Sequence, residues 1–175
     1  MTTPPPTLIQ FGELSAQRRR QLEGDEHDPF DMAGVYMDWQ PKPRHVGLLD
    51  PEGRLIAAAG VVVARAAVGD HAVDVAGLGG VIVARAHRGR GLARRIVGGA
   101  LELGATLGPE LAMLFCREDR SGLYARLGFS EVPRPVRVAQ RNGSEVVMPL
   151  VTMWRTLRPQ ADPPRGPVRL LTLPF

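Results

Sequence analysis

The sequence has 175 residues, of which 44% are hydrophobic and 23% charged, and its formal net charge at pH 7 is +4. This size suits one folded domain with a sizeable core and leaves no room for two. An apolar run of about eighteen residues and a signal peptide are both absent, so we expect a cytoplasmic protein without a membrane partner. A single cysteine and four histidines without HExxH spacing exclude an internal disulfide and predict that no metal is bound.

The first half of the chain is expected to form four strands, one helix and an acidic segment. Strands are predicted at 7–12, 45–49, 55–68 and 71–84, with turns at 50–53 and 69–70. Ser15 is a suitable N-cap for a helix at 16–23. The acidic segment 24–38 predicts a short helix flanked by loops. Glycines at 77, 79 and 80 predict that the fourth strand bulges and separates from a neighbour to admit a ligand.

The second half centres on a helix at 92–107, whose apolar residues recur at helical spacing and which Gly108-Pro109 ends. A strand at 111–116, a helix at 121–127 and late strands near 135–140 and 145–156 follow. Residues 1–6 are expected to be flexible, and 158–175 to form a Pro-rich tail with a short terminal strand. Strands on both sides of a crossover helix predict a single α/β domain, 1–175, around a mixed and largely antiparallel sheet.

The segment Arg88-Gly89-Arg90-Gly91 lies between the strand that contains Val83 and the helix that begins at Leu92. A glycine-rich turn at a helix N-terminus favours phosphate, because the first helical N–H groups lack partners and the helix dipole is positive there. Glycine also allows an anion to approach the backbone closely, and the arginines add cationic partners. The missing Lys-Ser/Thr pair excludes a P-loop, and the glycine spacing does not fit a dinucleotide fingerprint.

From Arg88 to Ala93 the residues follow the pattern Arg-x-x-Gly-x-Gly/Ala. This pattern resembles the acetyl-CoA pyrophosphate loop of the GCN5-related N-acetyltransferase (GNAT) superfamily. A second block, from Leu123 to Phe129, resembles the Tyr-x-x-x-Gly-Phe segment that closes the cofactor site of the same family. Two motifs in the order found in the family are stronger evidence for the resemblance than either motif alone. The resemblance implies the acyl-CoA N-acyltransferase fold, with acetyl-CoA as co-substrate.

The resemblance also implies roles for particular residues. The main chain of Val81 and Val83 would pair with the pantetheine arm, and N–H groups there would polarise the thioester carbonyl. Tyr124 would protonate the departing thiolate as a general acid. The cofactor-binding residues expected on this basis are Val81, Ile82, Val83, Arg88, Gly89, Arg90, Gly91, Leu92, Ala93 and Arg94.

The acidic N-terminal segment is the expected wall for a small cationic amine acceptor, which carboxylates and aromatic faces would hold. The alternative interpretation is a solvated acidic loop. The substrate-binding residues expected here are Asp28, Asp31, Asp38 and Trp39.

The sequence does not identify a general base, although attack requires that the acceptor amine lose a proton. Family members commonly use a carboxylate near the separated strand, but Gly79 has no side chain. Asp74, Glu118 and Asp119 are left as alternatives. Cys116 suggests a covalent acyl-cysteine, but an unpaired cysteine more often behaves as a small buried apolar residue.

Within the superfamily, the chain from Leu14 to Leu157 is most similar to the aminoglycoside 2'-N-acetyltransferase group. The supporting features are Asp38-Trp39, the strand from Ala76 to Val81, Leu114-Phe115-Cys116 and Leu123-Tyr124. The sequence departs from that group at Gly79, where an acid is expected. It departs again at Leu173-Pro174-Phe175, which lack the group's acidic, Trp-rich ending. Fold and cofactor therefore carry over, whereas an aminoglycoside acceptor does not.

The sequence thus predicts an N-acetyltransferase that moves an acetyl group from acetyl-CoA to a primary amine by direct attack in a ternary complex. One alternative is a non-catalytic acyl-CoA sensor, which the lack of an evident base favours. Another is a nucleic-acid binder that uses the arginines between 85 and 95. The scarcity of interleaved aromatic residues argues against that binder, so no nucleic-acid partner is expected. A late strand and an apolar tail are compatible with a homodimer.

Overall fold

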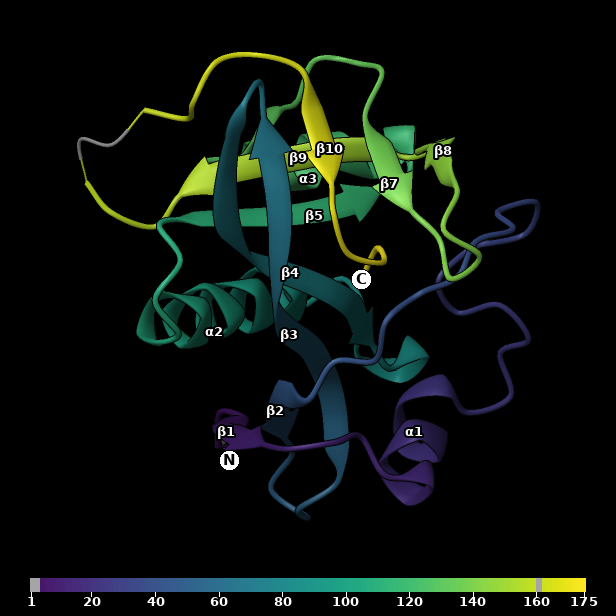
Figure 1. Cartoon of the computed structure of the whole chain (residues 1–175). Helices are drawn as coiled ribbons and strands as arrows, with labels where there is room; N and C mark the ends of the chain where they lie inside the picture. The colour runs from purple at the N-terminus through teal and green to yellow at the C-terminus, as the bar shows by residue number, and fades with distance from the viewer. Residues whose placement is uncertain (1–3, 160–161) are drawn as a thin grey trace.

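The computed structural model describes residues 4–159 and 162–175. One mixed sheet forms its centre, with the order β6-β9-β5-β4-β3-β10-β7-β8, while β2 pairs with both β3 and β1 (Figure 1). The strands are β1 (Thr7–Phe11), β2 (Arg44–Leu49), β3 (Leu55–Val68), β4 (His71–Val83), β5 (Leu111–Cys116), β6 (Ser130–Glu131), β7 (Arg137–Ala139), β8 (Glu145–Val147), β9 (Val151–Thr156) and β10 (Val168–Leu170).

The two longest strands, β3 and β4, form an antiparallel hairpin that extends across the molecule. β3 is long enough to pair with β2 near its start and with β10 near its end. β4 and β5 run parallel and are joined by a crossover that contains α2 (Leu92–Thr106). The expected mixed α/β sheet around a crossover helix is therefore confirmed.

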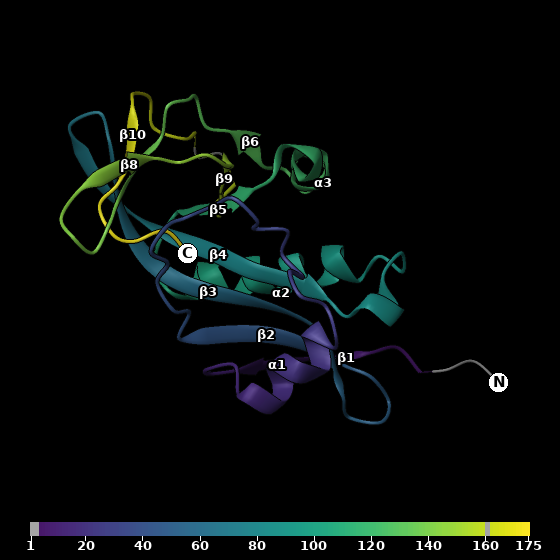
Figure 2. The same cartoon turned by 90° about the vertical axis from the view of Figure 1, so that its right-hand side faces the viewer.

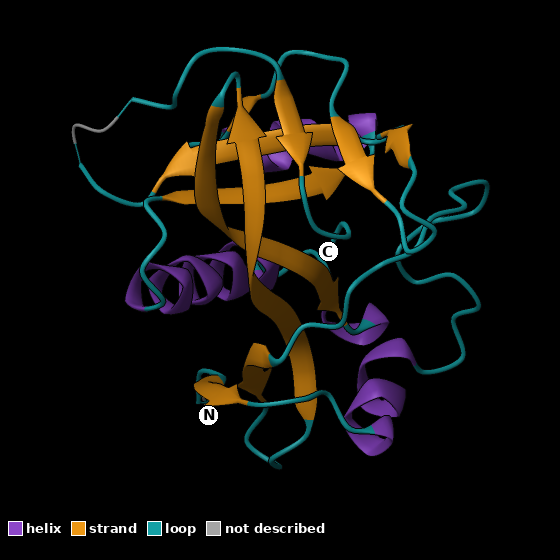
Figure 3. Ribbon diagram, viewed as in Figure 1, coloured by secondary structure: helices purple, strands orange, loops and turns teal. Residues whose placement is uncertain are grey.

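Helices cover parts of the sheet (Figures 2 and 3). α2 packs against β2, β3 and β4. Its residues Ile96, Val97 and Ala100 are fully buried, as the apolar spacing predicts. α1 (Ala16–Glu23) begins after Ser15, whose Oγ accepts a hydrogen bond from the Arg18 N–H at 3.2 Å. The remaining helical pieces are α3 (Ser121–Ala125) and the 3₁₀ turns Arg85–His87 and Glu118–Arg120.

The prediction of a short helix in 24–38 is wrong, because this segment is a series of turns and loops. Asp28 supplies the physical reason, since its two carboxylate oxygens accept hydrogen bonds from the main-chain N–H groups of Met32 and Ala33, both at 2.9 Å. Short polar side chains that bond the nearby backbone compete with the helical pattern. Pro29 and Gly34 weaken helix formation further.

The late strand expected at 145–156 is two strands, β8 and β9, separated by Met148–Leu150. Pro149 in this gap cannot donate to a strand ladder. The short strand β6 was not expected, and the terminal strand β10 begins at Val168. The expectations for residues 1–3 of the N-terminus and for 160–161 of the tail lie outside the described residues.

Candidate active site

Strands β4 and β5 separate at the centre of the sheet. Their pairing runs from Val75 opposite Leu111 to Leu78 opposite Leu114 and then stops, although both strands continue. β4 bulges at this point, because the register with β3 shifts between Ala58 and Gly60 and Gly80 has a φ of 60°. A bulge turns a strand away from its neighbour. The predicted opening beside the glycines of β4 is therefore present.

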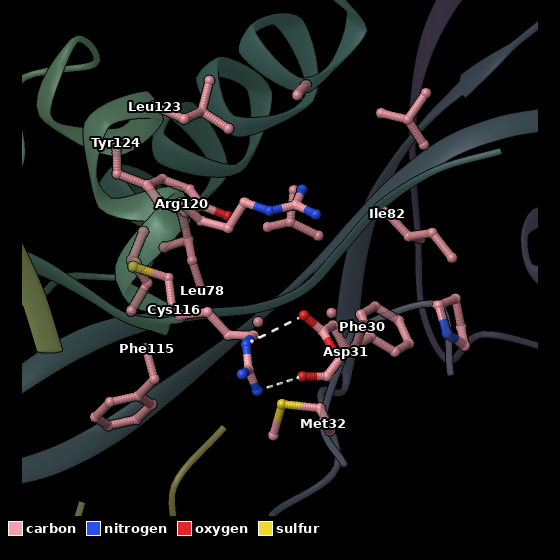
Figure 4. A pocket seen from close by; sticks show the side chains of 18 of the residues that line it. Phe30, Asp31, Met32, Leu78, Ile82, Phe115, Cys116, Arg120, Leu123 and Tyr124 are labelled. Carbon is pink, nitrogen blue, oxygen red and sulfur yellow. Dashed lines mark hydrogen bonds and ion pairs between the residues drawn. The ribbon is translucent and has the colours of Figure 1, made fainter. Parts of the chain in front are cut away.

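A cavity of about 830 Å³ extends from this opening. One side reaches the turn before α2, and the other reaches the segment that leads into β2. Figure 4 shows Leu123 and Tyr124 on one side of it and Phe30, Asp31 and Met32 on the opposite side. A cavity between two separated parallel strands can hold an extended molecule whose middle lies at the point of separation.

The turn before α2 presents glycines in the left-handed conformation. Gly89 has a φ of 75° and Gly91, the N-cap of α2, has a φ of 73°. A Cβ built at either glycine would meet no atom within 4 Å, so these positions need glycine for their backbone conformation. The N-terminus of a fifteen-residue helix therefore opens toward the cavity without a side chain in front of it.

Most of the predicted cofactor-binding residues line the cavity, namely Val81, Ile82, Val83, Arg88, Gly89, Gly91, Leu92 and Ala93. Arg90 and Arg94 are outside the lining set. Arg90 Nη1 lies 3.0 Å from His87 Nδ1, and Arg94 is exposed on α2. The structure thus brings eight of the ten residues together from β4, the turn that follows it and the first residues of α2.

Arg88 already has two partners. Its Nε donates to the Val83 carbonyl at 2.9 Å, and its Nη2 donates to a Glu26 carboxylate oxygen at 2.7 Å. The first contact closes the turn, and the second ties the turn to the acidic segment 24–38. An anion at the α2 N-terminus would compete with Glu26 for the guanidinium group.

Tyr124, on α3, lines the cavity with 8% of its surface exposed. Its ring packs edge-on against Phe129, with centroids 6.0 Å apart. Burial raises the pKa of Tyr124 to about 12, with a further increase from Cys116 and an opposing effect of Arg120. The hydroxyl therefore stays protonated at neutral pH, which is the state required of a proton donor.

Cys116, at the end of β5, is a free and buried thiol. Burial, with Glu131 and Asp119 nearby, raises its pKa to about 11. A thiol with this pKa is almost entirely protonated at neutral pH and is a poor nucleophile. The expected burial of Cys116 is confirmed, although the residue lines the cavity, and the raised pKa disfavours an acyl-cysteine.

Asp31 and Trp39 are the two predicted acceptor-binding residues that line the cavity. Asp31 has a φ of 53°, which is rare outside glycine. Arg117 holds it there, because its Nη1 donates to the Asp31 carbonyl at 2.9 Å and its Nε lies 3.1 Å from the carboxylate (Figure 4). This ion pair connects the acidic segment to the end of β5.

Asp28 and Asp38, which were also expected in the acceptor wall, are outside the lining set of the cavity. The Asp28 carboxylate accepts hydrogen bonds from the main-chain N–H groups of Met32 and Ala33 in its own loop. Asp38 accepts a hydrogen bond from the Arg141 N–H at 3.2 Å and faces the turn between β7 and β8. Both carboxylates therefore stabilise loops in this structure.

The cavity residues that sequence reasoning missed include Lys42, His45, Phe115 and Phe175. Phe115 lies between Trp39 and Phe175, with ring centroids 6.3 and 5.0 Å away, and the three rings form an apolar wall. An alternating apolar strand indicated only that Phe115 is buried. Phe115 and Phe175 are 60 positions apart in the chain, so no local sequence pattern predicts their contact.

Lys42 and His45 add two basic side chains to the part of the cavity that is formed by the segment leading into β2. Burial lowers the pKa of Lys42, with a further decrease from Arg19. Burial also lowers the pKa of His45, against a smaller opposite effect of its hydrogen bond to the Gly12 carbonyl. His45 Nδ1 lies 2.7 Å from that oxygen and is therefore the protonated nitrogen of the neutral ring.

Among residues 4–159 and 162–175, no group of three or more His, Cys, Asp or Glu side chains is arranged to hold a metal ion. No helix in the same residues is long and apolar enough to cross a bilayer.

The parallel pair that opens beside a helix N-terminus, with a cavity through the opening, defines the acyl-CoA N-acyltransferase class of α/β proteins. The family model for the acetyltransferase (GNAT) domain matches residues 20–132 of the sequence. The chain belongs to the GNAT acetyltransferase family, and membership indicates an acyltransferase. No curated protein matches the sequence.

Solved structures show the same fold at low sequence identity. The Escherichia coli GNAT family N-acetyltransferase YhbS, solved with CoA, matches with a TM-score of 0.61 and 18% identity over 98% of this chain and 93% of its own. A GNAT family acetyltransferase from Staphylococcus aureus Mu50 matches with a TM-score of 0.56 and 9% identity over 87% and 100%. N-acetylglutamate synthase from Neisseria gonorrhoeae, complexed with CoA and N-acetyl-glutamate, matches with a TM-score of 0.57 and 11% identity over 87% and 35%. These similarities establish the fold.

Proposed function

We propose that the protein transfers an acetyl group from acetyl-CoA to a primary amine by direct attack in a ternary complex. The observation that carries this proposal is the single cavity that joins the N-terminus of α2 to the acceptor side through the separated ends of β4 and β5. Such a cavity lets both substrates meet at the separation point. Membership of the acetyltransferase family supports the same conclusion.

In this proposal the pyrophosphate of acetyl-CoA binds at Gly89 and Gly91, where unpaired helix N–H groups and the dipole favour negative charge. Arg88 exchanges Glu26 for a phosphate oxygen. The pantetheine arm extends along Val81 to Val83, whose main chain faces the gap left by the end of the β5 pairing. The thioester would then lie beside the bulge of β4, where main-chain N–H groups can stabilise the oxyanion.

Tyr124 is the proposed general acid. Its location in the cavity and its pKa of about 12 both support this role, because a protonated hydroxyl near the sulfur can neutralise the departing thiolate. The high pKa of the Cys116 thiol supports direct attack by the amine rather than a covalent enzyme intermediate.

The acceptor is proposed to be a small amine that packs on the wall formed by Trp39, Phe115 and Phe175. A cationic group on the acceptor could reach Asp31, but it would have to compete with Arg117 for that carboxylate. The similarity to aminoglycoside 2'-N-acetyltransferases remains a prediction, as do the cytoplasmic location, the lack of nucleic-acid and membrane partners and a homodimer.

A non-catalytic acyl-CoA sensor is the second candidate. It is favoured by one observation, the absence of a carboxylate side chain at Gly79 in the bulged strand. Turnover with any physiological amine would exclude this candidate.

The first test is a calorimetric titration of the purified protein with acetyl-CoA, which we expect to bind at micromolar strength. Spermidine, kanamycin, glycine and a short peptide with a free N-terminus would then be screened as acceptors by the release of free CoA thiol. Failure to bind acetyl-CoA would overturn the proposed function. Binding without turnover of any amine would favour the sensor.

A further inference from the structure

Beside the cavity, neighbouring positions on β3 and β4 are both glycine and leave the face of the sheet without side chains there. His45 on β2 is opposite Gly60 on β3, and Gly60 is opposite Gly79 on β4. Cross-strand partners present their side chains to the same face of a sheet. His45, Gly60 and Gly79 therefore form a cross-strand row that runs from β2 over β3 to the bulge of β4.

Lys42 lies along this row. A Cβ built at Gly60 would be 2.7 Å from both Cβ and Cγ of Lys42, and a Cβ built at Gly79 would be 2.7 Å from its Cε. The lysine side chain therefore crosses β3 and extends to β4, in space that any larger residue at Gly60 or Gly79 would occupy. In Figure 1 the loop before β2 crosses over β3 on its way to that strand.

The end of the Lys42 side chain lies at the point where the strands separate. Gly79 directly follows Leu78, the last residue of β4 that pairs with β5. Both Lys42 and Gly79 line the cavity. Under the proposed function, the thioester and the acceptor nitrogen meet at this location. Lys42 is also the single lysine of the sequence, in which the other basic side chains are arginine and histidine.

We infer that Lys42 is the general base that takes a proton from the acceptor amine, an inference that rests on the proposed acetyl transfer. Gly79 has no side chain, and Lys42, from the loop before β2, would supply the missing base at this position.

The charges around Lys42 favour its neutral form. Burial and Arg19, which projects from α1, both lower its pKa, and none of the ion pairs in the described part of the chain involves Lys42. His45, which has Glu13 nearby, faces Lys42 from β2. The main-chain oxygen of Phe175 lies 2.9 Å from the Cβ position of Gly79. The partial negative charge of that oxygen opposes the effect of Arg19 on Lys42.

Two other groups in the cavity are less suitable bases. His45 Nε2 lies 3.1 Å from the Cβ position of Gly60 on β3, so its ring ends one strand short of Gly79, whereas Lys42 Cε lies 2.7 Å from the Cβ position of Gly79 itself. The Asp31 carboxylate is already engaged by Arg117, whose Nε lies 3.1 Å away.

The proposed step balances as follows. Neutral Lys42 Nζ takes one proton from the acceptor ammonium, and the freed nitrogen lone pair forms a bond to the thioester carbon. The carbon–sulfur bond breaks, and the sulfur takes the hydroxyl proton of Tyr124. The nitrogen loses a second proton, which restores the Tyr124 hydroxyl, and Lys42 passes the first proton to solvent. The products are the N-acetylated amine, CoA thiol and one released proton.

The single lysine permits a direct test that needs no acceptor. Protein labelled with ¹³C and ¹⁵N in lysine should give one side-chain signal, which the Lys42→Arg variant would lack. We expect this signal to titrate with a midpoint below the ordinary value of 10.5. We also expect acetyl-CoA to shift it more than ADP, which carries a pyrophosphate but no thioester. A midpoint at or above 10.5, or equal shifts with both ligands, would overturn the inference.

Activity separates a base from a simple positive charge. With the amine of the screen that wild type acetylates fastest, Lys42→Met and Lys42→Arg should both lower kcat by about 100-fold or more, while acetyl-CoA binding is kept. Wild-type kcat/KM should rise with pH around the midpoint of the lysine signal, and this rise should vanish in Lys42→Arg. If Lys42→Arg keeps wild-type kcat, Lys42 acts only by its charge and the inference is wrong.

The matched control is Arg20→Met, which removes an exposed cation from the neighbouring helix α1 and should leave kcat unchanged. The failure of the proposed function itself would be recognised differently: the wild-type protein would neither bind acetyl-CoA nor acetylate any amine.

Discussion

At the residue scale, Arg88 makes two contacts that differ in range. Its Nε is bonded to the Val83 carbonyl, and its Nη2 is bonded to Glu26, which has 15% of its side chain exposed. The first contact is local and holds the turn in shape. The second is between distant segments and competes with any phosphate that enters. Under the proposed function, Arg88 would therefore link cofactor binding to the position of the acidic segment.

Tyr124→Phe removes the proposed general acid without changing the packing of the ring. We expect kcat to fall by about 100-fold or more, with acetyl-CoA binding unchanged in a calorimetric titration. Because the pKa of Tyr124 is about 12, its deprotonation should not limit the rate near neutral pH. Tyr36→Phe is the control, since Tyr36 is 93% exposed. Unchanged turnover in Tyr124→Phe at all pH values would contradict the assignment.

His45 should make stability depend on pH. Its pKa is lowered from 6.5 in the folded protein, so the unfolded chain binds a proton more readily. The free energy of unfolding should therefore decrease as the pH falls below about 6.5, by at most about 1.4 kcal/mol per pH unit for one proton.

The measurement is urea unfolding between pH 7.5 and 5.5 for wild type and His45→Asn, whose amide can still donate to the Gly12 carbonyl. The decrease should be smaller in the variant. Equal decreases in both proteins would mean that His45 does not cause the effect.

At the element scale, the N-terminus of α2 depends on a backbone conformation that side chains disfavour. Gly91→Ala places a Cβ at a φ of 73°, and we expect it to lower the free energy of unfolding by roughly 1–2 kcal/mol. It should also weaken acetyl-CoA binding, because the added methyl group lies before the open helix end. Chemical unfolding and calorimetry measure the two effects.

Gly98→Ala is the matched control in the same helix. Gly98 is in the interior of α2, and a Cβ there would meet no atom within 4 Å. Alanine should therefore stabilise the helix by roughly 0.5–1 kcal/mol and leave acetyl-CoA binding unchanged. A similar loss of binding in both variants would argue against an anion site at Gly91.

The acidic segment 24–38 lacks regular structure but is positioned by ion pairs near its start and in its middle. Glu26 bonds to Arg88 beside the turn before α2, and Asp31 bonds to Arg117 after β5. These arginines flank the opening between β4 and β5. The segment thus forms one wall of the cavity through charge pairing rather than through a helix of its own.

At the scale of the whole molecule, the cavity is assembled from segments that are distant in the chain. β4, the turn before α2 and α3 form one side of it, the proposed cofactor side, whereas residues before β2 and the last residues of the chain form the other, the proposed acceptor side. Phe175 is central to this arrangement, because its ring covers Gly77 and is 5.0 Å from the ring of Phe115.

Phe175→Ala should lower the free energy of unfolding by about 3–5 kcal/mol, since Phe175 is 3% exposed and its loss leaves a cavity. Leu171→Ala is the control in the same segment, because Leu171 is 40% exposed and should change stability by no more than about 0.5 kcal/mol. Chemical unfolding of both variants checks this prediction. Equal effects would mean that the aromatic wall contributes little to stability.

Local sequence signals determined most of the secondary structure. The hairpin of β3 and β4, the helix α2 and the glycine-rich turn each follow from residue periodicity or from glycine in a short window. The family resemblance, which depends on short motifs, pointed to Tyr124 and to eight other residues that line the cavity. Segment 24–38 was predicted incorrectly, because the bonds of Asp28 to its own loop and the ion pairs of Glu26 and Asp31 outweigh helical propensity.

By itself, the sequence determined the fold class, the glycine-rich turn before α2 and the family resemblance, because these depend on residues that are adjacent or regularly spaced. The tertiary structure decided which acidic residues face the cavity, since Asp31 lines it whereas Asp28 and Asp38 bond to loops. It also placed Lys42 beside Gly79. That contact depends on the pairing of β2, β3 and β4, and long-range strand register leaves no mark in a local pattern.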